Sequence, residues 1–186
     1  LGMTATPDKR DDNIESRNIY EIFDHNIAYE IRLQQAMEED LLCSFHYFGI
    51  TDLSMITDEG GSKEEQLEQF RYLTSDERVK YVMQQASYFG YSGDRVKGLI
   101  FCSRIEEARE LSAKFNTQGL RTIALSGADS EEARAEAIER LTMDVQSSED
   151  NYLDYILTVD IFSEGTDIVE VNQVIMLRPT QSPIVF

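Results

Sequence analysis

Short apolar runs alternate with amphipathic segments along the second half of the chain. The apolar runs have strand length and β-rich composition, and they predict strands at 96–102, 121–125, 155–159 and 174–177. Two helices are predicted between the first three strands, each with one apolar face. Strands that alternate with such helices indicate a mostly parallel sheet with right-handed crossovers, covered on both faces. The predicted fold is therefore an α/β three-layer sandwich. The apolar faces comprise Ile105, Ala108, Leu111 and Phe115 on one helix, and Ala133, Ala137, Ile138 and Leu141 on the other.

Capping boxes mark the starts of three predicted helices, with Ser, Thr or Asp followed three residues later by Glu. They pair Thr74 with Glu77, Ser103 with Glu106, and Asp129 with Glu132. The helix after the first box should end at the glycines 90 and 93. Its predicted apolar face consists of Val79, Val82, Met83 and Ala86.

The first half of the chain has a less regular pattern. Residues 13–42 predict two helical pieces, and the aromatic-rich residues 42–50 predict a strand. Residues 52–62 predict a loop, and 63–72 a polar helix. The run Gly60-Gly61-Ser62-Lys63 lacks the spacing of a phosphate-binding loop, so we interpret it as a plain loop.

Polar residues follow the predicted parallel strands, at Ser103-Arg104, Ser126-Gly127, 158–160 and 178–180. Because the carboxyl ends of parallel strands meet at one edge, these segments should lie together. Free N–H groups at helix starts could then hold a phosphate backbone without reading base sequence. Ser103 and Ser126 are equally compatible with purely structural roles as cap and turn residues.

A polar segment with the sequence Glu164-Gly165-Thr166-Asp167 separates the last two predicted strands. The glycine lets backbone approach a ligand closely, and the aspartate can accept hydrogen bonds from a sugar hydroxyl. The same residues also fit an ordinary connecting turn.

Composition and charge narrow the class of protein. Hydrophobic residues make up 41% of the 186 residues, which is typical of a globular domain with a single hydrophobic core. The formal net charge of −18 argues against general, charge-driven affinity for DNA or RNA, so any such contact needs a local groove. No apolar run is long enough for a membrane span and no signal-peptide pattern opens the sequence. We expect a cytoplasmic protein with no membrane partner.

Cysteines and histidines form no catalytic or metal-ligand pattern. Cys43 and Cys102 lie inside apolar runs and are predicted to be buried free thiols in a reducing compartment. His25 and His46 are interpreted as structural. We therefore predict no metal site in these residues.

Taken in order, several segments resemble the motifs of superfamily 2 helicases and translocases, of the DEAD/DEAH-box and restriction-enzyme motor type. Residues 1–7 resemble motif III, 99–104 motif IV, 124–127 the segment after it, and 158–167 motif V. The resemblance implies a RecA-like fold. We expect residues 1–12 to end a first RecA-like domain and 13–186 to form the second, truncated before motif VI. With no initiator Met at Leu1, the sequence would be a piece of a longer protein.

The resemblance also implies roles for individual residues. Glu164, Gly165 and Asp167 would bind the nucleotide, with Asp167 near its ribose. Thr4 and Thr6 would couple the nucleotide site to the nucleic-acid site. Many relatives have Thr where this chain has Val159, so only a backbone contact is implied there. The implied nucleic-acid contacts are Ser103, Arg104, Ser126, Gly127, Thr158 and Asp160.

The resemblance implies an ATP-dependent helicase as the parent protein, with ATP and Mg²⁺ as its cofactors. Its implied partners are DNA, in preference to RNA, and the first RecA-like domain. Phosphoryl transfer needs a phosphate-binding loop, a metal and a charge-stabilising arginine. The sequence contains no G-x-x-x-x-G-K-[S/T], no acidic metal-binding motif and no motif VI. We therefore expect the chain alone to be inactive, with no catalytic residue and no tightly bound cofactor.

Two other interpretations are compatible with the residues. The chain could be a stand-alone α/β nucleotide-binding or protein-interaction module in which Gly165 and Asp167 lie in an ordinary loop. It could also be a Rossmann-type enzyme, although no G-x-G-x-x-G follows any predicted strand.

Overall fold

Among the residues that the structure describes, four parallel strands form one sheet in the order β2-β3-β1-β4. The structure is a computed structural model and describes residues 19–50, 71–145, 150–162 and 167–178. All three neighbouring pairs of strands are parallel, which confirms the prediction of a parallel sheet. The strands are β1 (Gly98–Phe101), β2 (Thr122–Ser126), β3 (Tyr155–Val159) and β4 (Gln173–Met176).

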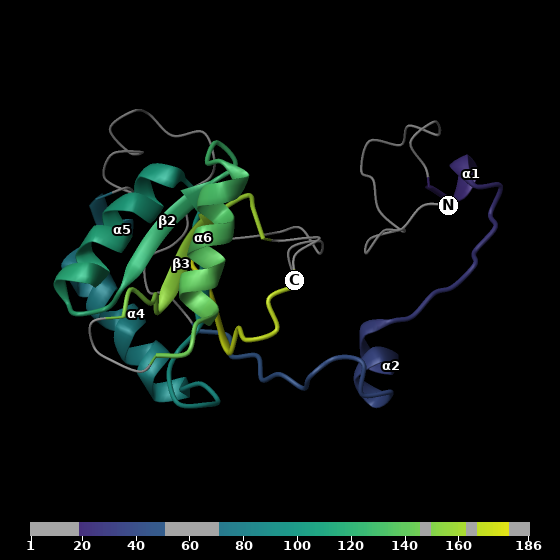
Figure 1. Ribbon diagram of the computed structural model, residues 1–186, viewed down its shortest axis with the longest axis horizontal. Helices are drawn as coiled ribbons and strands as arrows, with labels where there is room; N and C mark the ends of the chain where they lie inside the picture. The colour runs from purple at the N-terminus through teal and green to yellow at the C-terminus, as the bar shows by residue number, and fades with distance from the viewer. Residues whose placement is uncertain (1–18, 51–70, 146–149, 163–166, 179–186) are drawn as a thin grey trace. The chain divides into compact units, whose positions relative to one another are not determined.

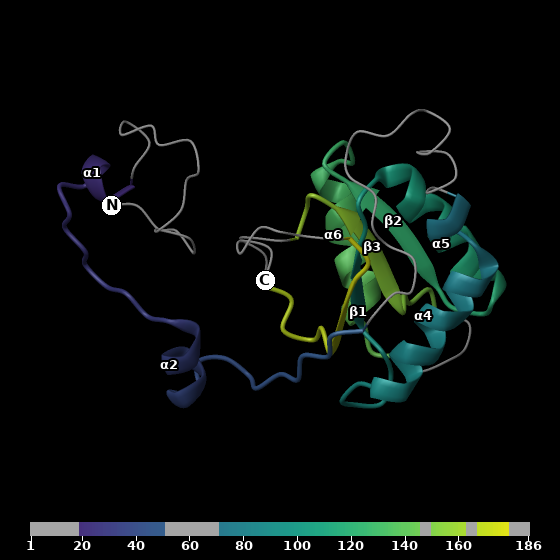
Figure 2. The ribbon, with the colours of Figure 1, turned by 180° about the vertical axis from the view of Figure 1, so that it is seen from behind.

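Helices cover both faces of this sheet. α4 (Asp76–Phe89) and α5 (Ile105–Thr117) lie on one face and α6 (Glu131–Thr142) on the other (Figures 1 and 2). Successive residues of β1 point to opposite faces, so Ile100 packs with α4 and α5 whereas Leu99 packs with α6. The predicted α/β three-layer sandwich is confirmed, with a buried hydrophobic cluster on each side of the sheet.

Local signals fix the ends of α4. Ser75 is its N-cap, and the Ser75 hydroxyl accepts a hydrogen bond from the Arg78 N–H at 3.2 Å. The cap therefore lies one residue beyond the predicted start of the box at Thr74. Gly90 ends the helix with φ 70°, a conformation that a side chain would strain.

Gly98 allows a close approach at the start of β1. A Cβ atom at this position would overlap the Tyr155 ring and lie 3.3 Å from the Gln173 carbonyl oxygen. The Tyr155 hydroxyl donates to Gln173 Oε1 at 2.5 Å, and Gln173 Nε2 donates to the carbonyls of Ala86 and Gly90. These contacts hold the end of α4 against the amino ends of β3 and β4.

The chain forms two compact units, Leu1–Asp58 and Glu59–Phe186. The first contains α1 (Ile19–Ile22) and α2 (Leu33–Glu38), which confirm the two helical pieces predicted in 13–42. The predicted domain limit between residues 12 and 13 stays a prediction.

The predicted strand at 42–50 is wrong. Residues 43–50 have no regular secondary structure, and Phe45, Tyr47 and Phe48 are half exposed or more. Aromatic residues favour strands only where a partner strand and a packed face are available. Within the described part of the chain, residues 43–50 belong to no strand ladder. Cys43 is consequently exposed, which corrects its predicted burial, whereas Cys102 is buried as predicted.

Candidate functional site

The carboxyl ends of β1 to β4 meet at one edge of the sheet, as the sequence predicts. Phe101 of β1 is level with Thr158 of β3 and with Met176 of β4, and Ser126 of β2 is level with Val159. The residues that follow these ends come from four separate segments of the chain. We call this set the carboxyl edge, and it comprises Ser103, Arg104, Ser126, Gly127, Asp160 and Arg178.

Ser103 and Arg104 connect β1 to α5, and both are exposed. Arg104 is the N-cap of α5 and makes no side-chain cap hydrogen bond, so the predicted capping box of Ser103 and Glu106 is wrong. The Ser103 backbone N–H instead donates to Glu107 Oε2 at 3.1 Å. Glu107 can reach back in this way because its side chain is turned into the core, whereas Glu106 is exposed.

A buried ion pair lies behind this edge. The Arg78 Nη1 and Glu107 Oε1 atoms are 3.4 Å apart, and the two side chains are 4% and 1% exposed. Arg78 also donates to the carbonyls of Leu73 at 2.7 Å and of Leu177 at 3.4 Å. The pair therefore connects the start of α4 to the segments that follow β1 and β4.

Sequence reasoning missed this pair, because Arg and Glu are rarely buried. A signal was nevertheless present in the helical spacing. Arg78 lies four residues before Val82, and Glu107 four residues before Leu111, so each belongs to the apolar stripe of its helix. Two opposite charges on facing apolar stripes indicate a buried ion pair, because burial of a single unpaired charge would cost too much free energy.

Ser126 and Gly127 open the turn between β2 and α6. The predicted capping box of Asp129 and Glu132 is wrong, because Ser130 is the N-cap and its hydroxyl accepts from the Ala133 N–H at 3.2 Å. The Asp129 carboxylate instead points back to the turn. Its Oδ2 accepts hydrogen bonds from the Ser126 N–H at 2.7 Å and from the Ser126 hydroxyl at 3.0 Å. The Ser126 backbone hydrogen bond is the main reason why the pKa of Asp129 is lowered.

The turn after β3 carries Thr158 and Asp160. The Thr158 side chain is fully buried, and its hydroxyl donates to the Ile161 carbonyl at 3.1 Å. It therefore contributes to the turn and is not presented at the surface. Asp160 has φ 56° and its side chain is 81% exposed. Its Oδ1 lies 3.1 Å from Nη1 of Arg178, which follows β4.

The predicted nucleotide-binding residues are only partly described by the structure. Asp167 is exposed. Glu164 and Gly165 lie outside the described residues, as do Thr4 and Thr6. Their predicted roles stay predictions.

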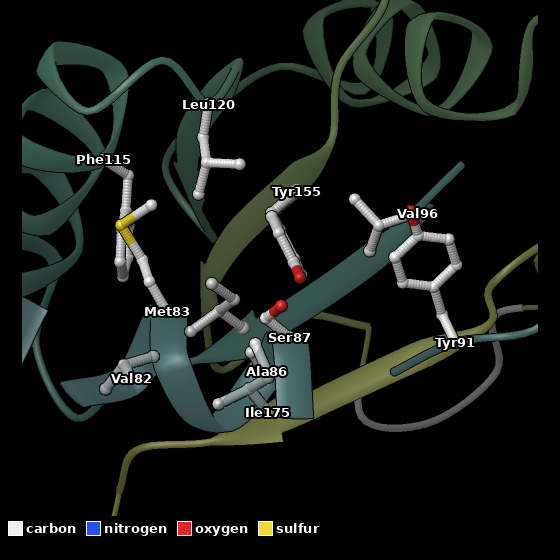
Figure 3. A pocket seen from close by; sticks show the side chains of 11 residues that line it. Val82, Met83, Ala86, Ser87, Tyr91, Val96, Phe115, Leu120, Tyr155 and Ile175 are labelled. Carbon is white, nitrogen blue, oxygen red and sulfur yellow. The ribbon is translucent and has the colours of Figure 1, made fainter. Parts of the chain in front are cut away.

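An apolar cavity of about 230 Å³ lies between α4, α5 and the sheet (Figure 3). Three of the residues around it, Val96, Leu120 and Tyr155, belong to the starts of β1, β2 and β3 or come just before them. The cavity therefore lies away from the carboxyl edge. No charged side chain lines it, so it offers no cationic group that could neutralise a phosphate. Its lining also includes Val82, Met83, Ala86, Ser87, Tyr91, Ile100, Phe115 and Ile175.

Within the described ranges, no group of three or more His, Cys, Asp or Glu side chains could hold a metal ion. The helices of these ranges are also too short or too polar to cross a membrane.

The parallel sheet with helices on both faces, and polar segments at its carboxyl edge, defines an α/β domain of the RecA-like class. The helicase conserved C-terminal domain family matches residues 77–186, which is more than half of the chain. The chain belongs to this family, the C-terminal domain of superfamily 2 helicases. No curated protein matches the chain significantly.

Proposed function

We propose that this chain is the second RecA-like domain of an ATP-dependent helicase or translocase. Its carboxyl edge would form one wall of a cleft that binds ATP and a nucleic-acid backbone, and the first RecA-like domain of the same protein would form the other. The observation that carries this proposal is the shared edge, where four segments distant in sequence end level with one another. Ligands of open α/β sheets bind at this kind of edge.

Nucleic-acid binding is supported by the polar groups that the edge exposes. Ser103 and Arg104 are exposed just before α5, whose N-terminus favours anions. Such contacts position a backbone and carry no base-sequence information. Because the net charge is −18, we expect binding to be confined to this edge and to weaken strongly with salt. We favour DNA over RNA as the partner.

Among the described residues, the support for ATP binding comes from Asp167. The exposed carboxylate of Asp167 could accept hydrogen bonds from the ribose, next to Glu164 and Gly165. When bound, ATP with Mg²⁺ would supply the free energy of phosphoryl transfer. The 186 residues contain no phosphate-binding loop of their own, so the chain alone should hydrolyse no ATP. Thr4 and Thr6 would couple the two ligand sites.

The test uses the complete gene product. We expect it to hydrolyse ATP and to separate or track strands, with greater stimulation by single-stranded DNA than by RNA. The 186-residue chain, assayed beside it, should hydrolyse ATP no faster than buffer. A complete product without nucleic-acid-dependent ATP hydrolysis would contradict the proposal.

Asp167 provides a residue-level test in the complete protein. Asp167→Ala should weaken ATP use, measured as KM and kcat, while single-stranded DNA binding without ATP stays at the native level. The matched control is Asp144→Ala, another exposed aspartate, just beyond the C-terminus of α6. Unchanged kinetic constants for Asp167→Ala would remove Asp167 from the site.

A further inference from the structure

We propose that Arg178 is a phosphate-binding residue and that Asp160 is the counter-ion that a phosphate group replaces. This inference rests on the proposed function and deepens it. It assigns the phosphate contact at the carboxyl edge to a residue that the motif resemblance did not identify. It also changes the expected role of Asp160 from a contact with the strand to a partner of Arg178.

Arg178 is held with unused hydrogen-bonding capacity. Its side chain is 15% exposed, and its Nη1 lies 3.1 Å from Asp160 Oδ1. The Nε atom is buried and has no hydrogen-bond partner among the described residues. The guanidinium carbon lies 5.9 Å from the centre of the Phe101 ring, at the end of β1. Asp160 contacts Nη1 alone, so an acceptor with several oxygens could bind the two Nη atoms together, whereas the buried Nε is out of its reach.

The backbone that leads into Arg178 is also held by hydrogen bonds. Leu177, the residue before Arg178, donates its N–H to the Phe101 carbonyl at 2.9 Å. Its own carbonyl accepts from Arg78 at 3.4 Å. Leu177 is thus held through both its N–H and its carbonyl, which restrains the backbone that leads into Arg178 and reduces the conformational entropy lost when a ligand binds.

Asp160 is a weak competitor for this guanidinium. Its side chain is 81% exposed, so water solvates the carboxylate well and little free energy is lost when it separates from the 15% exposed Arg178. A phosphate group offers more oxygens and can bind the planar guanidinium in a bidentate manner. The carboxylate itself would repel a phosphate, so it cannot be the direct contact.

Two sources of phosphate are compatible with this chemistry, a nucleic-acid backbone and a nucleotide. Both are tested with the complete gene product, in which both walls of the proposed cleft are present. One assay is fluorescence anisotropy with a labelled 20-nucleotide single-stranded DNA in a salt series, and the other uses a fluorescent ATP analogue. Arg178→Ala should weaken binding of one probe about tenfold, the typical loss for a charge-assisted hydrogen bond. If DNA is the source, the slope of log K against log salt should also fall by about 0.7.

Asp160→Asn should change binding in the opposite direction. Loss of the counter-ion should tighten binding of the same probe about threefold, within the range of an exposed ion pair. Asn tolerates the positive φ of 56° at this position, so the turn should be retained. In the double variant Arg178→Ala/Asp160→Asn, the tightening should disappear, because no guanidinium remains to be released.

Charge-matched controls lie at the opposite end of the sheet. The Arg140 carbonyl accepts from Leu153, which comes two residues before β3, and Asp144 follows α6. Arg140→Ala and Asp144→Asn carry the same charge changes as the two test variants. Both should leave binding of the two probes within twofold of the native protein. Arg178→Lys keeps the charge but loses the planar fork, and should bind between the native protein and Arg178→Ala.

The outcomes separate this inference from the proposed function. If the complete native protein binds neither probe, the inference and the binding part of the proposed function both fail. If it binds but folded Arg178→Ala binds equally well, only the inference fails. If Asp160→Asn tightens binding equally with and without Arg178, the tightening comes from the change in overall charge. That result would overturn the role of Asp160 as the counter-ion of Arg178. Thermal unfolding establishes that each variant is folded.

Discussion

Arg78 and Glu107 form an ion pair 3.4 Å long inside the domain, with side chains only 4% and 1% exposed. Each partner also binds a backbone group next to the carboxyl edge, the Ser103 N–H for Glu107 and the Leu177 carbonyl for Arg78. The pair therefore fixes two segments of the edge to the start of α4. Loss of either charge of this buried pair should therefore also disturb the position of the carboxyl edge.

Glu107→Ala should lower the free energy of unfolding by about 3–5 kcal/mol, because it leaves the buried Arg78 charge and the Ser103 N–H without this partner. Urea unfolding followed by circular dichroism measures the loss. Glu110→Ala is the matched control on the same helix. Glu110 is partly exposed and 3.7 Å from Lys114, so its removal should cost under about 1 kcal/mol. If both variants lowered the free energy of unfolding equally, the buried pair would contribute no more to stability than the exposed one.

Gly98→Ala should destabilise the domain by about 1–3 kcal/mol, the usual cost of overpacking, because the new methyl group would overlap the Tyr155 ring. Thermal unfolding provides the measurement. Gly127→Ala serves as the control, since a Cβ atom at Gly127 would have no atom within 4 Å. Its melting temperature should stay within a few degrees of the native value.

Asp129→Ala should reduce stability in a pH-dependent way. Hydrogen bonds from Ser126 lower the pKa of Asp129 below its ordinary value of 3.8. A lowered pKa in the folded state means that the stabilisation is fully present above 3.8 and is lost as the pH falls through the folded-state pKa. We expect Asp129→Ala to lower the free energy of unfolding by about 1 kcal/mol at pH 7, similar to the loss of a helix cap. This difference from the native chain should become smaller below pH 3.8.

The control for this pH series is Asp144→Ala, which removes an exposed carboxylate away from the turn. Its difference from the native chain should stay small at every pH. If the Asp129→Ala difference were the same at pH 7 and at pH 3, the hydrogen bonds to Ser126 would not be its cause.

The two cysteines should differ in reactivity. Cys102 is fully buried, and burial raises the pKa of its thiol far above the ordinary value, which suppresses the reactive thiolate. Cys43 is exposed. The folded chain should therefore react rapidly with one equivalent of an aromatic disulfide reagent, and with the second only after unfolding. Cys43→Ser should abolish the rapid phase, and rapid reaction that persists in this variant would place Cys102 at the surface.

Much of the fold was predictable because its signals are local. The run at 155–159 is β3, and the apolar positions Ala108, Leu111 and Phe115 are the buried face of α5. Parallel pairing then followed from the alternation of strands and helices, and with it the common edge. The strand predicted at 42–50 failed because aromatic composition specifies a strand only in the presence of a partner.

Helix starts and the candidate site were less predictable. Sequence spacing made Ser103 and Asp129 appear to be N-caps, but the N-caps are Arg104 and Ser130. The Ser103 N–H donates instead to Glu107. The choice between neighbouring Asp, Glu and Ser residues depends on which side chain faces the core. Burial of Glu107 depends in turn on Arg78, 29 positions away in the chain.

The sequence by itself determined the order of the elements, their apolar faces and the edge at which polar residues gather. It could do so because helix and strand periodicity and turn composition are properties of short segments. Only the tertiary structure decided that Arg78 pairs with Glu107 and that Asp160 pairs with Arg178. These contacts join residues from different elements, and their strength depends on burial and distance that no short segment specifies.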